Sequence, residues 1–327
     1  MDYMYDVTAL GELLIDFSLN GINDRGIALF AQNPGGAPAN VLAMVTCLGG
    51  KTAFIGKVGC DAFGRFLLQT LENAGIDSAG LVLDSTVLTT LAFVQLDAQG
   101  DRSFSFYRKN GADLMLTSAE VKKELIDNGA IFHCGSVSLT DEPCRSTVHT
   151  AVRYAKDRGK IISYDPNYRP FLWNSEEEAQ REMAALVPYA DILKVSEEEM
   201  VILTGTTEVK KGAARLFEQG PAIVLISLGA QGAFYYCANG SGTLPAYDVP
   251  TVDTTGAGDA FLGTVLFYVR NKTRRDLETI TQDELADIVD CANAAGSLTT
   301  TAYGAIPAMP DKNSIAKCRQ AANTVRG

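Results

Sequence analysis

Apolar segments alternate with charged segments along the chain from about residue 120 onward. The apolar runs that suit buried strands lie at 130–139, 159–166, 190–196 and 222–229. The charged segments beside them carry apolar residues at helical spacing and lie at 118–129, 143–159, 175–190 and 209–220. Because strands that alternate with helices pair in parallel, the pattern predicts an α/β fold, a parallel sheet with helices on both faces.

Two regions depart from this rhythm. Residues 91–108 show two alternating segments around the turn 97–101, which predicts a β-hairpin, and residues 12–21 alternate weakly. We interpret these pieces as a small β flap. Ligands of parallel α/β proteins bind at the carboxyl ends of the strands, so a flap there would act as a lid. An ordinary edge hairpin fits the same pattern.

Composition narrows the class of protein. The 327 residues carry a net charge of −11, which argues against a nucleic-acid partner, because phosphate backbones require clustered Lys and Arg. The first residues are acidic rather than basic, and apolar stretches such as 260–269 are far shorter than the roughly 20 residues of a membrane span. Seven scattered cysteines indicate reduced thiols. We expect a soluble, cytoplasmic protein with no membrane partner.

The segment 252–263 places three small residues, Gly256, Ala257 and Gly258, directly before Asp259 at the start of an apolar run. Backbone N–H groups at such a helix N-terminus can approach an anion closely, as in phosphate sites. We expect the helix dipole to keep Asp259 ionised, so that it can accept the proton of a hydroxyl during phosphoryl transfer. A tight turn with a well-placed acid is the alternative.

Two rival phosphate motifs fail. Residues 49–52 read Gly-Gly-Lys-Thr, but Val45 stands where a P-loop needs its first glycine. Residues 256–261 lack the third glycine of a dinucleotide fingerprint, because Phe261 occupies that position. With only two histidines, metal clusters and histidine-based triads are also disfavoured.

Two further segments suggest a polyhydroxylated ligand. Gly35 and Gly36 permit close backbone approach, and Asn40 offers a donor and an acceptor near a helix start. A glycine-rich helix cap is the simpler interpretation of these residues. The apolar strand of 159–166 leads into Asp165, Asn167 and Arg169, and polar side chains at a strand's carboxyl end suit an active site.

Together these motifs resemble the two signatures of the ribokinase-like (PfkB-type) carbohydrate kinases, over essentially the whole chain. The segments 106–117, 164–173 and 194–199 are most similar to those of fructokinases. The resemblance implies one three-layer α/β/α domain over 1–327, with a mainly parallel sheet and a β lid formed by about 12–33 and 91–110. It implies transfer of the ATP γ-phosphate to the 6-hydroxyl of D-fructose, with Mg²⁺ and K⁺, by a homodimer joined through the lid.

The resemblance also implies site residues. Asp259 would be the base, with Gly256, Ala257 and Gly258 as the anion hole. The residues implied to face the sugar are Asp16, Gly36, Asn40, Phe106, Arg108, Arg169 and Asp259. Those implied to line the nucleotide are Ser227, Gly229, Gly232, Asn293, Gly256 and Gly258. Those implied to frame K⁺, largely through backbone carbonyls, are Asp253, Thr255, Thr299, Ala302 and Gly304.

One segment departs from the family pattern. Glu199 would reach Mg²⁺ through water, but Ser196 replaces the usual Asn of that segment, which leaves the roles of both residues open. The sequence also allows two other functions: a kinase of 2-keto-3-deoxygluconate or of another sugar, and a non-catalytic sugar-binding regulator. Asp259 argues against the regulator, because a protein without turnover has no need of that carboxylate.

Overall fold

The computed structural model describes residues 3–96 and 102–326. A nine-stranded sheet in the order β13-β12-β11-β10-β9-β8-β1-β4-β5 forms its middle layer. All of its strand pairs are parallel except those made by β12. The strands are β1 Tyr5–Leu10, β4 Thr52–Gly59, β5 Ile76–Asp84, β8 Gly129–Gly135, β9 Ile161–Asp165, β10 Ile192–Ser196, β11 Ile223–Ser227, β12 Ala233–Cys237 and β13 Gly240–Leu244.

Helices cover both faces of this sheet, and each face has its own buried apolar cluster. The helices packed on the first face are α1 Ala37–Cys47, α2 Ala62–Asn73, α8 Ala257–Val269, α9 Arg274–Glu278, α10 Gln282–Thr299 and α11 Lys312–Arg326. Those on the second face are α3 Lys123–Asp127, α4 Cys144–Asp157, α5 Glu176–Leu186, α6 Glu197–Thr204 and α7 Val209–Phe217. The predicted three-layer α/β/α fold is therefore confirmed.

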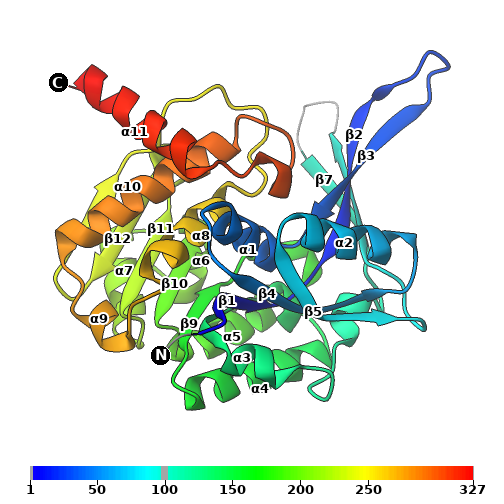
Figure 1. Ribbon diagram of the computed structural model, residues 1–327, viewed down its shortest axis with the longest axis horizontal. Coiled ribbons are helices and arrows are strands. Elements are labelled where there is room, and N and C mark those ends of the chain that lie inside the picture. Colours follow the sequence, from blue (N-terminus) through cyan, green and yellow to red (C-terminus); the bar gives the residue numbers. More distant parts are fainter. Residues whose placement is uncertain (1–2, 97–101, 327) are drawn as a thin grey trace.

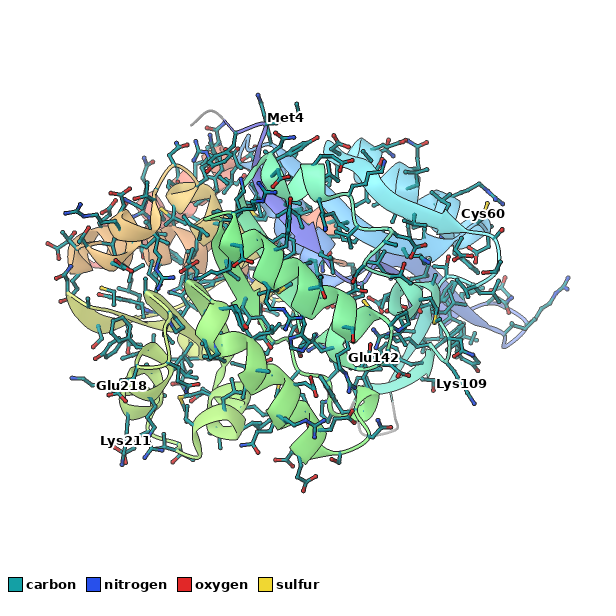
Figure 2. The ribbon with its side chains drawn as sticks, turned by 90° about the horizontal axis from the view of Figure 1, so that it is seen from below. Met4, Cys60, Lys109, Glu142, Lys211 and Glu218 are labelled. Carbon is teal, nitrogen blue, oxygen red and sulfur yellow. The ribbon has the colours of Figure 1, made fainter. Side chains whose placement is uncertain are left out.

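The second helical layer is amphipathic, as its sequence predicts. In α4 the buried positions include Val148, Ala151 and Val152, spaced to form one apolar stripe. Figure 2 shows this layer, coloured green, facing the viewer, with Lys211 and Glu218 at its left edge. None of the helices in the described part of the chain combines the length and apolar character that crossing a bilayer requires.

Two predicted boundaries are wrong. The strand expected over 130–139 ends at Gly135, and the chain then enters the short helical turn Val137–Leu139. The helix expected over 118–129 is limited to Lys123–Asp127. Thr117 donates from its backbone and its hydroxyl to Glu120, which closes a separate turn before the helix.

A separate four-stranded sheet, in the order β3-β2-β6-β7, stands beside the main sheet, and we call it the lid sheet. Its strands are β2 Leu14–Ile22, β3 Ala28–Gly35, β6 Leu91–Leu96 and β7 Arg102–Tyr107. Figure 1 shows the β2–β3 hairpin extending away from the body. The predicted hairpin of 91–108 is confirmed, although its turn, 97–101, lies outside the described residues.

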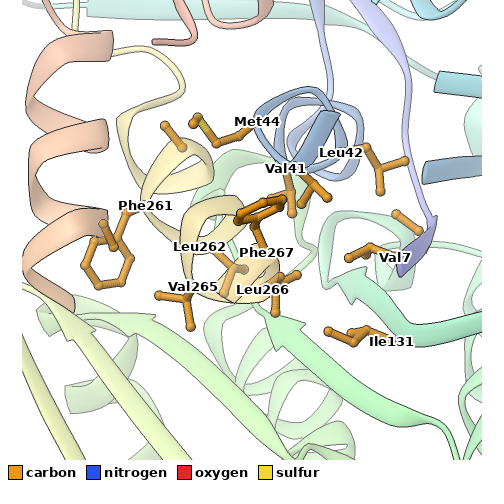
Figure 3. Packing of buried hydrophobic residues seen from close by; sticks show 14 of the residues in the cluster. Val7, Val41, Leu42, Met44, Ile131, Phe261, Leu262, Val265, Leu266 and Phe267 are labelled. Atoms are coloured by element: carbon orange, nitrogen blue, oxygen red, sulfur yellow. The ribbon is translucent and has the colours of Figure 1, made fainter. Parts of the chain in front are cut away.

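Helices α1 and α8 pack closely against each other on the first face. Figure 3 shows Val41 and Met44 of α1 beside α8, above Val7 and Ile131 of the strands. A Cβ atom on Gly263 would lie 2.6 Å from Met44 Cβ and 2.7 Å from the Val41 carbonyl oxygen. Glycine at this position therefore allows the two backbones to approach.

Candidate active site

The N-terminus of α8 forms the floor of the site. Gly256 is the N-cap residue, with φ of 78°, a conformation that disfavours other residues. A Cβ atom there would lie 2.5 Å from Ala305 Cβ, so both backbone and space call for glycine. The amide of Ala257 makes only a long 3.3 Å bond to the Thr254 carbonyl. The first-turn amides of a helix lack intrahelical partners and can therefore receive an anion.

Asp259 lies in the first turn of α8 and is 9% exposed. Burial raises the pKa of Asp259 to about 6, outweighing Lys194 and Asn40, which both lower it. Desolvation is the largest of these contributions, and a pKa of about 6 still leaves the carboxyl mostly ionised at neutral pH. A carboxylate with a pKa near 6 is better matched to accepting a proton at neutral pH than an exposed one.

Asn40, in the first turn of α1, contacts the Asp259 carboxylate. Its Nδ2 atom donates to Asp259 Oδ2 at 2.8 Å. Its Oδ1 atom is buried and has no hydrogen-bond partner among the described residues. A buried acceptor of this kind needs a donor, and a ligand hydroxyl supplies one.

A buried ion pair lies beside the same helix terminus. Lys194 Nζ of β10 contacts Asp165 Oδ2, at the end of β9, at 2.6 Å. A Cβ atom on Gly258 would lie 3.0 Å from that ammonium, so the cation lies against the N-terminus of α8. Asp165 Oδ1 is buried without a partner in the described part of the chain. The sequence interpretation missed Lys194, although a lysine inside the apolar run 190–196 was a signal.

The lid sheet brings two of the expected sugar residues toward the body. Asp16 lies on β2, and burial raises its pKa to about 6 against the lowering effect of Arg169. A Cβ atom on Gly35 would collide with the Asp16 carboxylate. Phe106 of β7 stacks on Phe171 with ring centroids 5.1 Å apart, which joins the lid sheet to the loop after β9. Arg169 is exposed and donates to the Tyr168 carbonyl.

Arg108 and Gly36 both lie against other groups of the protein at the base of the lid sheet. Arg108 is buried, and all three guanidinium nitrogens already donate to Asp113, Thr140 and the Val137 carbonyl. A sugar would have to compete with these acceptors, so the structure gives Arg108 an anchoring contact at the base of the lid. Gly36 faces the Glu12 carbonyl, which a side chain at that position would strike.

Four of the expected nucleotide residues lie outside α8, on the side of the sheet where α8 begins. Ser227 ends β11, and Gly229 and Gly232 follow in a turn with φ of 58° and 97°. Asn293 of α10 donates its amide to the Leu244 and Pro245 carbonyls at 2.9 and 3.1 Å. Its nitrogen therefore holds the segment after β13 in place.

The loop before α8 and the loop after α10, which carry the residues implied for K⁺, lie against each other. Asp253 accepts bonds from the backbone and hydroxyl of Thr255 and from the backbone of Gly304. The Asp253 amide in turn donates to the Thr300 carbonyl. Ala302 lies in the exposed part of the second loop, and Thr299 is buried with its hydroxyl on the Ala295 carbonyl. Asp253 therefore connects the two loops.

Glu199 and Ser196 form a capping box at the start of α6. The two Glu199 oxygens accept from the backbone amides of Tyr168 and Ser196, at 2.6 and 2.7 Å. Burial raises the pKa of Glu199, as does Asp165. Ser196 therefore caps α6, a position that Asn suits equally well. Among the described residues no group of three or more His, Cys, Asp or Glu is arranged to hold a metal.

The geometry thus combines a buried carboxylate, a helix N-terminus and a lid sheet. The model of the pfkB family of carbohydrate kinases matches residues 4–312. The chain belongs to this family. The resemblance found in the sequence motifs is therefore confirmed, and the chain is a carbohydrate kinase.

The kinase is similar to curated relatives over nearly its whole length. It is 44% identical to Fructokinase-1 of Oryza sativa subsp. japonica, covering 97% of this chain and 98% of the relative. It is also 42% identical to Fructokinase-2 of Solanum lycopersicum, covering 93% of each.

Solved structures agree with this picture. A fructokinase from Xylella fastidiosa with bound ATP superimposes with a TM-score of 0.90 at 32% identity, covering 98% and 100% of the two chains. A fructokinase from Vibrio cholerae O395, bound to fructose, ADP and calcium ion, gives 0.84 at 34% identity, covering 95% and 97%.

Proposed function

We propose that the kinase is an ATP-dependent fructokinase that phosphorylates the 6-hydroxyl of D-fructose. The observation that carries the chemistry is the buried Asp259 carboxylate beside the N-terminus of α8. The choice of fructose rests on the fructokinase relatives and on two hydrogen-bond acceptors proposed to face the sugar, Asp16 and Asn40 Oδ1.

In the proposed reaction, Asp259 takes the proton of the sugar hydroxyl as its oxygen attacks the γ-phosphorus. The new O–P bond forms, the bond to the β-phosphate oxygen breaks, and ADP leaves. Asn40 holds one carboxylate oxygen of Asp259, which leaves the other for the hydroxyl. The amides of 256–258 and the Lys194 ammonium stabilise the negative charge of the transferring group.

We propose ATP as the phosphoryl donor and assign the two cations as follows. Bound Mg²⁺ would neutralise charge on the ATP phosphates, and Glu199 would reach it through water. K⁺ would lie between the two loops joined by Asp253. The residues proposed to frame it are Asp253, Thr255, Thr299, Ala302 and Gly304. The residues proposed for the nucleotide are Ser227, Gly229, Gly232 and Asn293.

The sugar side favours neutral hydroxyls over a carboxylate. Asp16 and the free Asn40 Oδ1 are both acceptors, which bind hydroxyl donors and disfavour a nearby anion. Arg169 is the observation in favour of a sugar acid such as 2-keto-3-deoxygluconate, because it is an exposed cation beside the site.

A coupled ADP-release assay over a sugar panel tests the assignment. We expect kcat/KM for fructose to exceed that for ribose or 2-keto-3-deoxygluconate by at least roughly tenfold, a gap worth about 1.4 kcal/mol. Asp16→Ala should damage fructose use more than ATP affinity. If the keto-deoxy acid gives the highest value, the fructose assignment is wrong while the kinase assignment stands.

We also propose that two copies associate through the lid sheet. The β2–β3 hairpin exposes large apolar side chains, with Ile22 67% and Leu29 46% accessible. Apolar patches of this kind are typical of association surfaces. Sedimentation equilibrium should give a dimer for the wild type and a monomer for Ile22→Lys/Leu29→Lys. A monomeric wild type would contradict the proposal.

A further inference from the structure

The four strands of the lid sheet all enter or leave the body beside one buried polar network. β2 begins two residues after Glu12, and β3 ends two residues before Ala37. β6 begins immediately after Thr90, and β7 ends immediately before Arg108. Glu12, Thr90 and Arg108 are all buried. The attachment of the whole lid sheet to the body is thus concentrated in one place.

Arg108 forms one side of this network. It pairs with Asp113 at 2.7 Å, and the second Asp113 oxygen accepts from the Thr90 hydroxyl. Arg108 also donates to Thr140 at 2.7 Å and to the Val137 carbonyl at 3.0 Å. The start of β6 and the end of β7 are therefore bound to the short helical turn Val137–Leu139, which follows β8.

Glu12 forms the other side. Its Oε1 atom accepts from the backbone amide of Ala37 at 3.0 Å, and its Oε2 atom lies 3.5 Å from the Ser138 hydroxyl in that same turn. Glu12 is 3% exposed, and Arg108 and Asp113 are the charged groups that act on its carboxyl. The carboxyl thus connects the turn that holds Arg108 to the segment after β3.

The contact with Ala37 matters because Ala37 is the first residue of α1. The N-cap residue of α1, Gly36, provides no side-chain hydrogen bond, and Pro38 has no N–H group. The Glu12 side chain, from a distant segment, therefore replaces an N-cap side chain by accepting the free Ala37 amide. Three residues after Ala37 comes Asn40, which holds Asp259 Oδ2.

We propose that Glu12 is a positioning residue, which couples the lid sheet to the catalytic base by fixing the first turn of α1. When the ends of the lid strands move, Glu12 moves with them, because it lies just before β2 and contacts Ser138. The shift of α1 that follows changes the position of Asn40 and so of Asp259. The role assigned to Asp259 rests on the proposed function. Glu12 itself touches neither substrate nor the reacting atoms.

Two substitutions separate the hydrogen bond from the charge. Glu12→Gln keeps an oxygen that can accept from Ala37, whereas Glu12→Ala removes it. We expect Glu12→Ala to lower kcat by about tenfold to a hundredfold, since misplacing a catalytic group by about 1 Å costs that much. Glu12→Gln should restore most of the turnover, and circular dichroism should show both variants folded.

A double-mutant cycle tests whether Glu12 acts through Asn40. Adding Glu12→Ala to Asn40→Ala should cost less than about twofold in kcat, because the contact it supports is already gone. Ser175→Ala is the matched control, since Ser175 caps α5, a helix that carries no site residue. Ser175→Ala should leave kcat unchanged in the wild-type and Asn40→Ala backgrounds.

Hydrogen exchange supplies a readout that needs no activity. Amides of residues 37–44 should exchange faster in Glu12→Ala than in the wild type, near the wild-type rate in Glu12→Gln, and unchanged in Ser175→Ala. Additive losses of kcat in the cycle, or unchanged exchange in Glu12→Ala, would overturn the proposal. A wild type that releases no ADP with any sugar would instead refute the proposed function, and the exchange result would still decide the anchoring role.

Discussion

Asn40 donates a hydrogen bond to Asp259 although the two residues lie 219 positions apart in the sequence. The contact depends on the close packing of α1 on α8, which Gly263 permits. It occupies only one of the two Asp259 oxygens and lowers the pKa of Asp259, which burial raises.

Replacing Asp259 with Asn should nearly abolish turnover. The amide cannot accept the hydroxyl proton, and loss of a general base typically costs about 10²- to 10⁴-fold in kcat. Titration calorimetry should show ATP affinity within about threefold of the wild type, because the anion hole is made of backbone. Asp248→Asn, at an exposed carboxylate after β13, is the control. An Asp259→Asn enzyme with more than a tenth of wild-type kcat would remove Asp259 from the mechanism.

The pH profile should report the charges around the base. Asp259 accepts a proton only when ionised, so kcat/KM should rise as pH increases through its pKa of about 6 and should be lost below it. Lys194 lowers the pKa of Asp259, so Lys194→Met should move this limb toward alkaline pH and reduce kcat by about tenfold or more.

Two further variants make that profile interpretable. Lys156→Met breaks a similar pair with the buried Asp191 away from the site and should leave the limb in place. Burial also raises the pKa of Asp16 to about 6, so the profile should be repeated in Asp16→Asn, where the limb should persist at lower kcat/KM. If the acidic limb of the pH profile stays in place in Lys194→Met, Lys194 does not set the pKa of Asp259.

Potassium should raise activity. A cation between the loops joined by Asp253 and Gly304 would fix the backbone that leads into Gly256, and with it the anion hole. Rates in K⁺ are compared with rates in tetramethylammonium at matched ionic strength, and we expect at least about a threefold difference. Equal rates would show that the loops need no ion.

Phe106→Ala should loosen the lid. Loss of the Phe171 contact should raise the sugar KM by about fivefold, a stacking contribution of about 1 kcal/mol, and should increase the share of ATP lost to water. Tyr107→Ala is the control, because the neighbouring side chain contacts Phe93 within the lid sheet instead. If neither KM nor the hydrolysis share changes, the β6–β7 hairpin is a structural edge.

The features that the sequence could predict depend on residues that are close together in the chain. The parallel core follows from alternating apolar and charged segments, and the turn of Gly256 before Asp259 follows from the need for small residues at a backbone anion site. The boundaries at Gly135 and Lys123 could not be predicted, because the apolar and charged pattern of the sequence continues past both of them.

Long-range contacts explain what the sequence could not predict. The pairing of Lys194 with Asp165 requires β10 to lie next to β9, and the raised pKa of Asp259 follows from burial by segments distant in the sequence. Arg108 could be placed near the lid but not paired, because its partners Thr140 and Val137 come from the loop after β8.

The position of α8 near the end of the chain has a consequence for synthesis. A nascent chain that has emerged only as far as β13 already contains Asp16, Asn40 and Arg169, but it lacks Asp259 and the helix terminus. The long sequence separation of Asn40 and Asp259 makes their contact one of the later ones to form. On the proposed mechanism, an unfinished polypeptide therefore cannot yet transfer phosphate, and turnover begins only once α8 docks on α1.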